Sequence, residues 1–146
     1  MFSHIVIAWD GSDHARSAFE YGLGIAEKFQ SRVQLVSVAR HVEHAETQDE
    51  RQDSRRQARQ FYESSASELV AAAKRRGISA ELLVVEGGHP AEVIVDTARS
   101  VGADLVIVGR RGLSGVTRFL IGSISDRIAR YAHCPVLLID GFASPP

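Results

Sequence analysis

Five short apolar segments are spaced along the chain, and they predict a sheet of five strands. These segments cover residues 4–9, 33–38, 80–85, 104–108 and 135–139. The first, fourth and fifth are nearly continuous in valine, isoleucine and leucine, which is typical of parallel strands covered on both faces. The second and third are interrupted by polar residues (Gln34, Ser37 and Glu81), so we expect these two strands to lie nearer an edge of the sheet.

Apolar residues at helical spacing fill the four intervals between these strands. The third of these segments opens with Pro90, which is favoured at the first position of a helix, and runs towards Gly102, a candidate C-terminal cap. The alternation of strands and helices, with right-handed crossovers, predicts an α/β fold with an open, doubly wound parallel sheet. We expect a single domain over residues 1–146. The four helical segments cover residues 15–29, 58–73, 90–102 and about 123–132.

One long polar segment, residues 41–56, follows the second predicted strand and can contribute little to a core. Long connections of this kind are usually functional or disordered. This one leaves the carboxyl edge of the sheet, where ligands bind in such folds. We favour a solvated, partly helical linker over a lid that covers a ligand, and we interpret Arg55, Arg56 and Arg59 as an exposed helix face.

The composition of the chain argues against two classes of binding partner, nucleic acid and membrane. The formal net charge of −1 creates no general field that would attract nucleic acid. No apolar run approaches the roughly 18 residues that span a bilayer, and no basic residue precedes the first apolar segment as it would in a signal peptide. Cys134 is the only cysteine, so no disulfide can form within the chain, and we expect a buried thiol. These features predict a cytoplasmic protein that binds neither nucleic acid nor membrane.

The most informative stretch begins where the fourth strand ends and reads VGRRGLSGVTRFLIGSIS (residues 108–125). Gly109 and Gly112 are two residues apart, and Gly122 precedes a helix. Glycine lets a ligand approach the backbone because it has no side chain. The start of a helix supplies unpaired N–H groups and the positive end of the helix dipole. Such a place suits a phosphate chain.

Side chains in this stretch have two compatible interpretations. Ser123 and Ser125 could donate hydroxyl hydrogens to a phosphate, with positive charge from arginine. Alternatively, Ser123 is an N-cap that forms a capping box with Asp126. Three arginines lie in the same stretch: Arg110, Arg111 and Arg118.

The spacing Gly109-x-x-Gly112-(nine residues)-Gly122-Ser123 resembles the ATP-binding signature of the universal stress protein family. The resemblance extends over nearly the whole chain, through the opening IVIAWDGS, the segment GADLVIVGRRG and the closing HCPVLLI. It implies a flavodoxin-like sheet with strand order 3-2-1-4-5 and a nucleotide held between strands one and four. The strand order reverses there, as at ligand sites in other open α/β sheets.

The resemblance also implies roles for individual residues. The backbone of Val38 would contact the adenine edge, and a Mg²⁺ ion would accompany the concentrated charge of a triphosphate. The family pattern assigns the adenosine end of the site to Ala8, Asp10, Val38, Val108 and Gly109. It assigns the phosphate end to Arg111, Gly112, Gly122, Ser123, Ile124 and Ser125.

Two positions depart from the commonest family pattern. Trp9 is bulkier than the residue usually found before the aspartate; it would stack on or crowd the base if it faced the pocket, and we favour a place in the core. The adjacent Arg110 and Arg111 leave open which of the two points to phosphate.

Other nucleotide-binding and phosphate-binding folds fit the sequence poorly. A Rossmann site needs GxGxxG after the first strand, where WDGSDHAR stands instead. A Walker loop needs Gly-Lys-Ser/Thr, but the only lysines, Lys28 and Lys74, follow no glycine-rich loop. The same shortage of lysine argues against a phosphorylated response regulator.

A metal site built from side chains is also disfavoured. Asp10 and Asp13 could form a carboxylate pair, although Asp13 better suits the first turn of a helix. His41 and His44 lie three residues apart in the polar segment, and we interpret them as solvated.

No nucleophile, base and orienting group can be assembled from the sequence, so we expect no dedicated enzyme and a weak ATPase at most. We expect a regulatory or stress-response module that depends on ATP or another adenine nucleotide and is recognised by an unknown protein partner. The alternative is a dimeric interaction or structural module that does not depend on nucleotide. Residues Val136–Ile139 would form an apolar edge strand that pairs with its copy, through which the family often forms homodimers.

Overall fold

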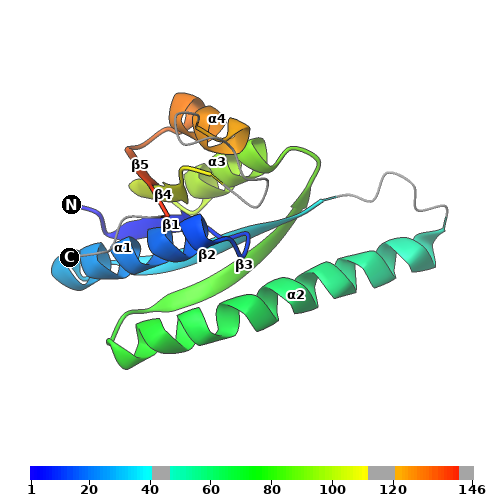
Figure 1. Ribbon diagram of the computed structural model, residues 1–146, viewed down its shortest axis with the longest axis horizontal. Helices are drawn as coiled ribbons and strands as arrows, with labels where there is room; N and C mark the ends of the chain where they lie inside the picture. The colour runs from blue at the N-terminus through cyan, green and yellow to red at the C-terminus, as the bar shows by residue number, and fades with distance from the viewer. Residues whose placement is uncertain (41–46, 112–120, 142–146) are drawn as a thin grey trace.

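The computed structural model of the protein describes residues 1–40, 47–111 and 121–141. Strands and helices alternate along the chain, as the hydrophobic pattern predicts (Figure 1). In chain order the elements are β1 (His4–Ala8), α1 (Asp13–Phe29), β2 (Arg32–Arg40), α2 (Gln48–Arg75), β3 (Ala80–Gly87), α3 (Pro90–Ser100), β4 (Leu105–Gly109), α4 (Ser123–Tyr131) and β5 (Val136–Ile139).

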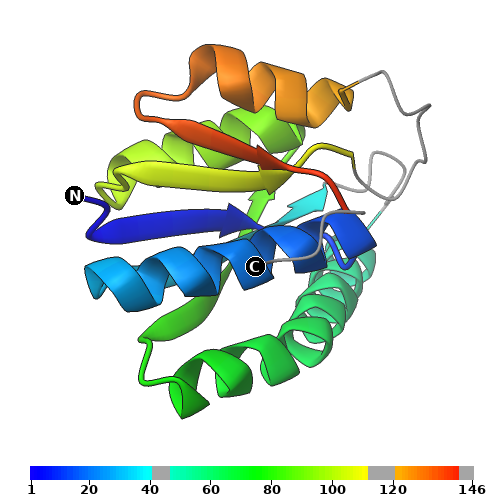
Figure 2. The same cartoon turned by 60° about the vertical axis from the view of Figure 1, so that its left-hand side comes forward.

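The five strands form one parallel sheet in the order β3-β2-β1-β4-β5. Helices α1 and α2 cover one face of the sheet, and α3 and α4 cover the other (Figure 2). The predicted doubly wound α/β fold and its strand order are therefore confirmed. The connections from β1 and β4 leave towards opposite faces, so these two neighbouring strands separate at their carboxyl ends.

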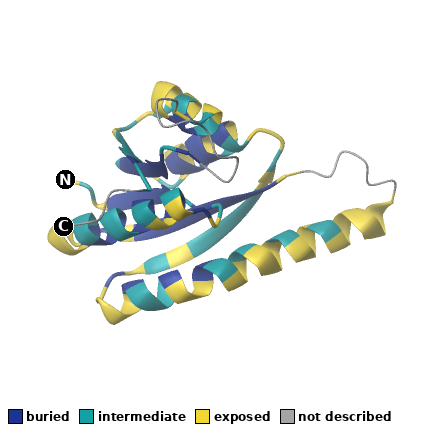
Figure 3. Ribbon diagram, viewed as in Figure 1, coloured by how far each residue is buried: buried dark blue, intermediate teal, exposed yellow. Residues whose placement is uncertain are grey.

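The core consists of two apolar layers, one on each face of the sheet. Successive side chains of β1 alternate between the layers: Ile5 and Ile7 pack towards α1 and α2, whereas Val6 packs towards α3 and α4. Burial is concentrated in the central strands and in the helix faces that contact them (Figure 3). Both layers end at the carboxyl edge of the sheet.

The two interrupted strands lie together on one side of the sheet. Strand β3 is an edge strand, and β2 lies next to it, between β3 and β1. The polar residues of β2 are compatible with this interior place because each finds a partner. The Ser37 hydroxyl donates to the Trp9 carbonyl at 2.7 Å, and the Gln34 amide donates to Glu81 at 3.3 Å. The hydrophobic pattern alone does not reveal these partners.

The predicted helical segments are correct in position, but not every apolar residue in them is buried. Phe29 ends the first predicted helical segment, yet it is 44% exposed and contacts Phe2 edge to face. Leu23 of the same helix is buried instead. In the second segment, Phe61 is 56% exposed. Cys134 is only half-buried, so the expectation of a buried thiol is corrected, and partial burial raises the pKa of this thiol.

The polar segment is helical where the structure describes it. Helix α2 begins at Gln48 behind a capping box between Thr47 and Glu50, and its N-terminal half extends beyond the sheet (Figure 1). Arg55 pairs with Glu86 at 3.1 Å and is exposed, in agreement with a solvated helix face. His41 and His44 lie outside the described residues. Within the described ranges, no helix is both long and apolar enough to cross a bilayer.

Gly109, the last residue of β4, has a structural role that yields a prediction. A Cβ atom at this position would lie 2.7 Å from the carbonyl carbon of His14, in the first turn of α1. Because backbone atoms cannot move aside easily, we expect Gly109→Ala to reduce the free energy of unfolding by about 1–3 kcal/mol. Urea unfolding followed by circular dichroism measures this change.

Gly24→Ala, within α1, is the matched control, since a Cβ atom there would meet nothing within 4 Å apart from the backbone of its own helix. This substitution should stabilise the protein by up to about 1 kcal/mol, because alanine favours the helix. A Gly109→Ala protein as stable as the unchanged one would contradict the close packing of β4 against α1.

Candidate functional site

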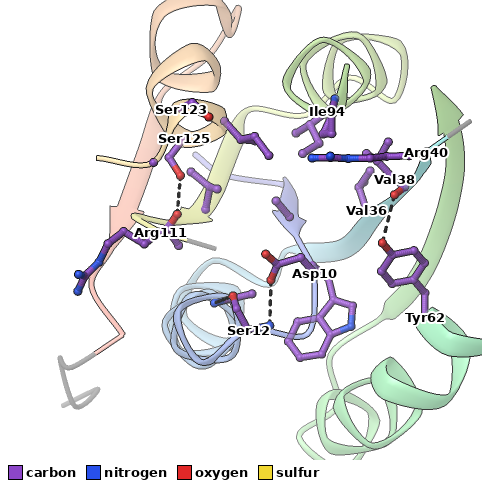
Figure 4. A pocket seen from close by; sticks show the side chains of 18 of the residues that line it. Asp10, Ser12, Val36, Val38, Arg40, Tyr62, Ile94, Arg111, Ser123 and Ser125 are labelled. Carbon is purple, nitrogen blue, oxygen red and sulfur yellow. Dashed lines mark hydrogen bonds between the residues drawn. The ribbon is translucent and has the colours of Figure 1, made fainter. Parts of the chain in front are cut away.

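A cavity of about 340 Å³ opens at the carboxyl edge of the sheet, where β1 and β4 separate (Figure 4). The ends of β1, β2 and β4 form its floor, and the first turns of α1, α3 and α4 form its walls. Helix α2 contributes Phe61 and Tyr62. All candidate residues from the sequence line this cavity except Arg110 and Gly112; Gly112 lies outside the described residues, as does Arg118.

The first turn of α4 forms one end of the cavity and differs from the capping-box expectation. The N-cap is Gly122, not Ser123, and no side chain among the described residues caps the helix. Asp126 instead pairs with Arg130, one turn further along the helix, at 2.9 Å. The capping box between Ser123 and Asp126 is therefore wrong, because Ser123 is already the first helical residue.

An uncapped first turn leaves amide hydrogens available. The Asp126 N–H donates to the Gly122 carbonyl at 2.9 Å and closes the first turn. The N–H groups of Ser123, Ile124 and Ser125 precede it and have no acceptor among the described residues, as expected at a helix start. Three amides therefore line the cavity wall at the positive end of the helix dipole.

Hydrogen bonds hold this turn against β4. The Ser125 hydroxyl donates to the Gly109 carbonyl at 2.7 Å, and Ser125 is buried. The Gly122 N–H donates to the Arg110 carbonyl at 2.9 Å. The Ser125 hydroxyl hydrogen is thus already used within the protein, whereas Ser123 has no such bond in the described residues. The amides are held in place by these contacts.

The opposite end of the cavity exists because β2 is longer than β1. Ala8 ends β1 and pairs with Val36, and the Trp9 N–H donates to the Val36 carbonyl at 2.9 Å. Alternate residues of a strand direct their backbone groups to the same side. The peptide groups of Val38 and Arg40 therefore point into the space beyond the end of β1.

Tyr62 from α2 closes this end of the cavity. Its hydroxyl donates to the Val38 carbonyl at 3.2 Å, while the Val38 N–H has no acceptor among the described residues. Burial raises the pKa of Tyr62, the negative charge of Asp10 raises it further, and the positive charge of Arg40 opposes the increase. Figure 4 shows the Arg40 side chain extending from β2 towards Ile94 on α3.

Asp10 lies on the floor of the cavity, between its two ends (Figure 4). One carboxylate oxygen, Oδ1, accepts the Ser12 N–H at 2.9 Å. Ser12 in turn caps α1, since its hydroxyl oxygen accepts the Ala15 N–H at 3.1 Å. Asp13 occupies the first turn of α1, as predicted. The carboxylate of Asp10 is thereby oriented by the chain that follows it.

Trp9 belongs to the core, as predicted, and also forms part of the cavity wall. It is 3% exposed and packs in the layer beneath α1 and α2. Its indole N–H donates to the Ser65 hydroxyl at 3.0 Å. It is the only tryptophan of the chain.

The two adjacent arginines occupy different positions. Arg111 lines the cavity and is 8% exposed, whereas Arg110 is not part of the lining. In Figure 4 the Arg111 guanidinium points away from the centre of the cavity. It lies 4.0 Å from Asp140, measured from Nη2 to Oδ1.

Sequence reasoning missed several lining residues. Tyr62 falls in the predicted helical segment over residues 58–73, and nothing in the local sequence distinguishes a core position from a cavity position. Arg40 could have been found, because it lies two residues beyond Val38 and strand alternation places both side chains on one face. The other missed residues are Ser12, Ala15, Val36, Phe61, Pro90 and Ile94. No group of three side chains suited to a metal occurs in the described ranges.

Solved structures share this architecture. The hypothetical protein MJ0577 superposes with a TM-score of 0.85 over 99% of both chains at 21% identity, which shows the fold. A universal stress protein in complex with cAMP gives a TM-score of 0.70 at 25% identity, over 96% of this chain and 98% of that one. A universal stress protein from Archaeoglobus fulgidus in complex with dAMP gives 0.65 at 23% identity, over 95% and 98%.

Sequence comparisons agree with this likeness. A putative universal stress protein of Staphylococcus epidermidis is 31% identical over 139 residues, which are 94% of this chain and 84% of that protein. The model of the universal stress protein family matches residues 1–140. The chain therefore belongs to the universal stress protein family.

Proposed function

We propose that the protein binds ATP, or another adenine nucleotide, in the cavity between β1 and β4, and that it acts as a nucleotide-dependent regulatory module in a stress response. The observation that carries this proposal is the uncapped first turn of α4 at one end of a cavity whose other end presents an open peptide group. The family members that bind cAMP and dAMP support an adenine ligand. The cavity volume of about 340 Å³ is in the range of small-molecule sites.

The adenine ring would lie at the Val38 end. The Val38 N–H can donate to a ring nitrogen of adenine, and the Val38 carbonyl has a second lone pair that can accept from the exocyclic amine. The apolar side chains of Ala8, Val36 and Ile94 line this end and suit the faces of a purine.

The ribose would lie above Asp10. This carboxylate is an acceptor, and a ribose hydroxyl is a donor, so the two groups are complementary. The central place of Asp10 in the cavity lets one ligand reach both Val38 and α4 (Figure 4).

The phosphates would bind at the start of α4. The amides of Ser123, Ile124 and Ser125 can donate to phosphate oxygens, and the helix dipole favours negative charge there. The Ser123 hydroxyl adds a donor. A Mg²⁺ ion would be held mainly by the phosphate oxygens and water, as is usual for this ion.

We infer that binding, not catalysis, is the function. Among the described residues that line the cavity, Asp10 is the single carboxylate and no histidine or lysine is present. Slow ATP hydrolysis is the most that we expect. We further propose that the protein works in the cytoplasm, where a lone, half-buried thiol stays reduced.

A substitution at Gly122 tests the phosphate site. Gly122→Asp places a carboxylate at an N-cap whose backbone already has the right conformation (φ −60°, ψ 148°), so the new side chain can bind the helix amides itself. We expect ATP affinity to fall by about tenfold or more, because the carboxylate occupies and repels the phosphate position. Isothermal titration calorimetry measures the affinity, and Trp9 fluorescence provides a second signal.

Gly122→Ala is the matched control. Its Cβ atom meets the Arg110 carbonyl oxygen at 3.3 Å, as the aspartate Cβ does, but it brings no acceptor. This variant should bind ATP within about threefold of the unchanged protein, a difference of less than 1 kcal/mol. Equal ATP affinity in the alanine and aspartate variants would exclude the first turn of α4 from the site.

We also propose a homodimer that forms through β5, in addition to nucleotide binding. This strand is the last of the sheet and consists of the apolar residues VLLI, three of which are only half-buried. The Val106 N–H donates to the Pro135 carbonyl and the Arg110 N–H to the Ile139 carbonyl, so odd-numbered residues of β5 face β4. The backbone groups of Val136 and Leu138 therefore point outward, where a second β5 could pair with them.

Leu138→Pro tests this pairing because proline removes the outward N–H but leaves the bonds to β4. We expect the proline variant to be a monomer by light scattering. Leu138→Ala, which loses the side chain and keeps the N–H, should remain dimeric. A monomeric unchanged protein, or a dimeric proline variant, would contradict pairing through β5.

A further inference from the structure

The loop that follows β4 is attached to the segment that follows β5. The Arg110 N–H donates to the Ile139 carbonyl at 2.7 Å. The Arg110 guanidinium lies 3.4 Å from Asp140, measured from Nη2 to Oδ2, and the Arg111 guanidinium lies 4.0 Å from the other oxygen of the same carboxylate. The two guanidinium groups therefore share one carboxylate.

The backbone next to Asp140 is itself anchored to α1. The Gly141 N–H donates to Nδ1 of His14 at 2.9 Å, and the Ser17 hydroxyl donates to the Gly141 carbonyl at 3.3 Å. A Cβ atom at Gly141 would lie 2.6 Å from the His14 ring, so the two residues are in close contact. These hydrogen bonds fix the backbone next to the Asp140 carboxylate.

Arg111 lies between the cavity and the carboxylate of Asp140. Its side chain lines the cavity, yet its guanidinium points away from the centre, towards the segment after β5 (Figure 4). A distance of 4.0 Å between Nη2 and Oδ1 is too long for a hydrogen bond, so this attraction between Arg111 and Asp140 is electrostatic. An arginine side chain also has several rotatable bonds through which it can turn.

We propose that Asp140 competes with the phosphates of the nucleotide for Arg111. Without a polyphosphate, the guanidinium rests beside Asp140; with one, it turns towards the first turn of α4 and pairs with the phosphate oxygens. Asp140 is then a positioning residue that lowers the affinity for the nucleotide, and it lowers this affinity more when the nucleotide carries more phosphates. This inference rests on the proposed function, because it requires the nucleotide to bind with its phosphates at α4.

Asp140→Asn tests the competition, since the amide keeps the shape of the side chain and removes its charge. We expect ATP to bind about threefold to fivefold more tightly, the size of effect that a partly exposed ion pair allows. The gain should be smaller for AMP and absent for adenosine, which has no phosphate. Calorimetric titrations of the intact protein with ATP, AMP and adenosine at two salt concentrations measure these ratios.

A second substitution separates competition for Arg111 from a general change of charge. In an Arg111→Gln background, the added Asp140→Asn change should leave ATP affinity unaltered, because the guanidinium for which the carboxylate competes is gone. Asp140→Glu should restore affinity towards that of the unchanged protein. Thermal unfolding of each variant verifies that the fold is retained.

The possible results are distinct. A gain that grows with phosphate number and disappears without Arg111 supports the competition. ATP binding that Asp140→Asn weakens or leaves unchanged overturns this inference alone, as does a gain that persists in the Arg111→Gln background. If the unchanged protein binds neither ATP nor AMP, the proposed function falls and this inference falls with it.

Discussion

The site depends on one constraint of the sheet: the chain leaves β1 and β4 towards opposite faces. Neighbouring parallel strands whose connections diverge cannot cover the space between their carboxyl ends. Because β1 stops at Ala8 while β2 continues to Arg40, the peptide groups of Val38 and Arg40 face that space. The first turn of α4 closes it on the far side and brings three open amides. The cavity thus follows from topology, and its chemistry follows from strand length and from a missing cap.

Two glycines beside the cavity have different roles: Gly109 is needed for packing, and Gly122 belongs to the proposed phosphate site. Gly109 is required by the protein itself, since α1 approaches β4 too closely for any side chain. Gly122 is not required in this way, because its backbone conformation is open to other residues and a Cβ atom would cause only a tight contact. Absence of a side chain at Gly122 keeps the helix uncapped, which is the condition that an anion site needs.

Much of this architecture could be predicted from the sequence, and the failures have physical reasons. Long apolar runs and helical periodicity locate the strands and helices because burial dominates their sequences. Ser37 and Gln34 interrupt the apolar pattern of β2, and that pattern does not reveal their partners, which lie far away in the chain. The cap of α4 was misjudged because Ser-x-x-Asp fits both a capping box and a plain first turn. Tyr62 reaches the site, and Asp140 approaches Arg111, through tertiary contacts that local patterns do not contain.

The central claim is that the amides at the start of α4 bind the phosphates while Val38 binds the base. Two-dimensional ¹⁵N–¹H NMR of the labelled protein, titrated with ATP and Mg²⁺, tests it most directly because each amide gives its own signal. We expect the largest shifts at Ser123, Ile124, Ser125 and Val38, and we expect adenosine to reproduce only the shift of Val38. Saturating ATP that leaves the α4 amides unshifted, or that shifts only amides elsewhere, would contradict it.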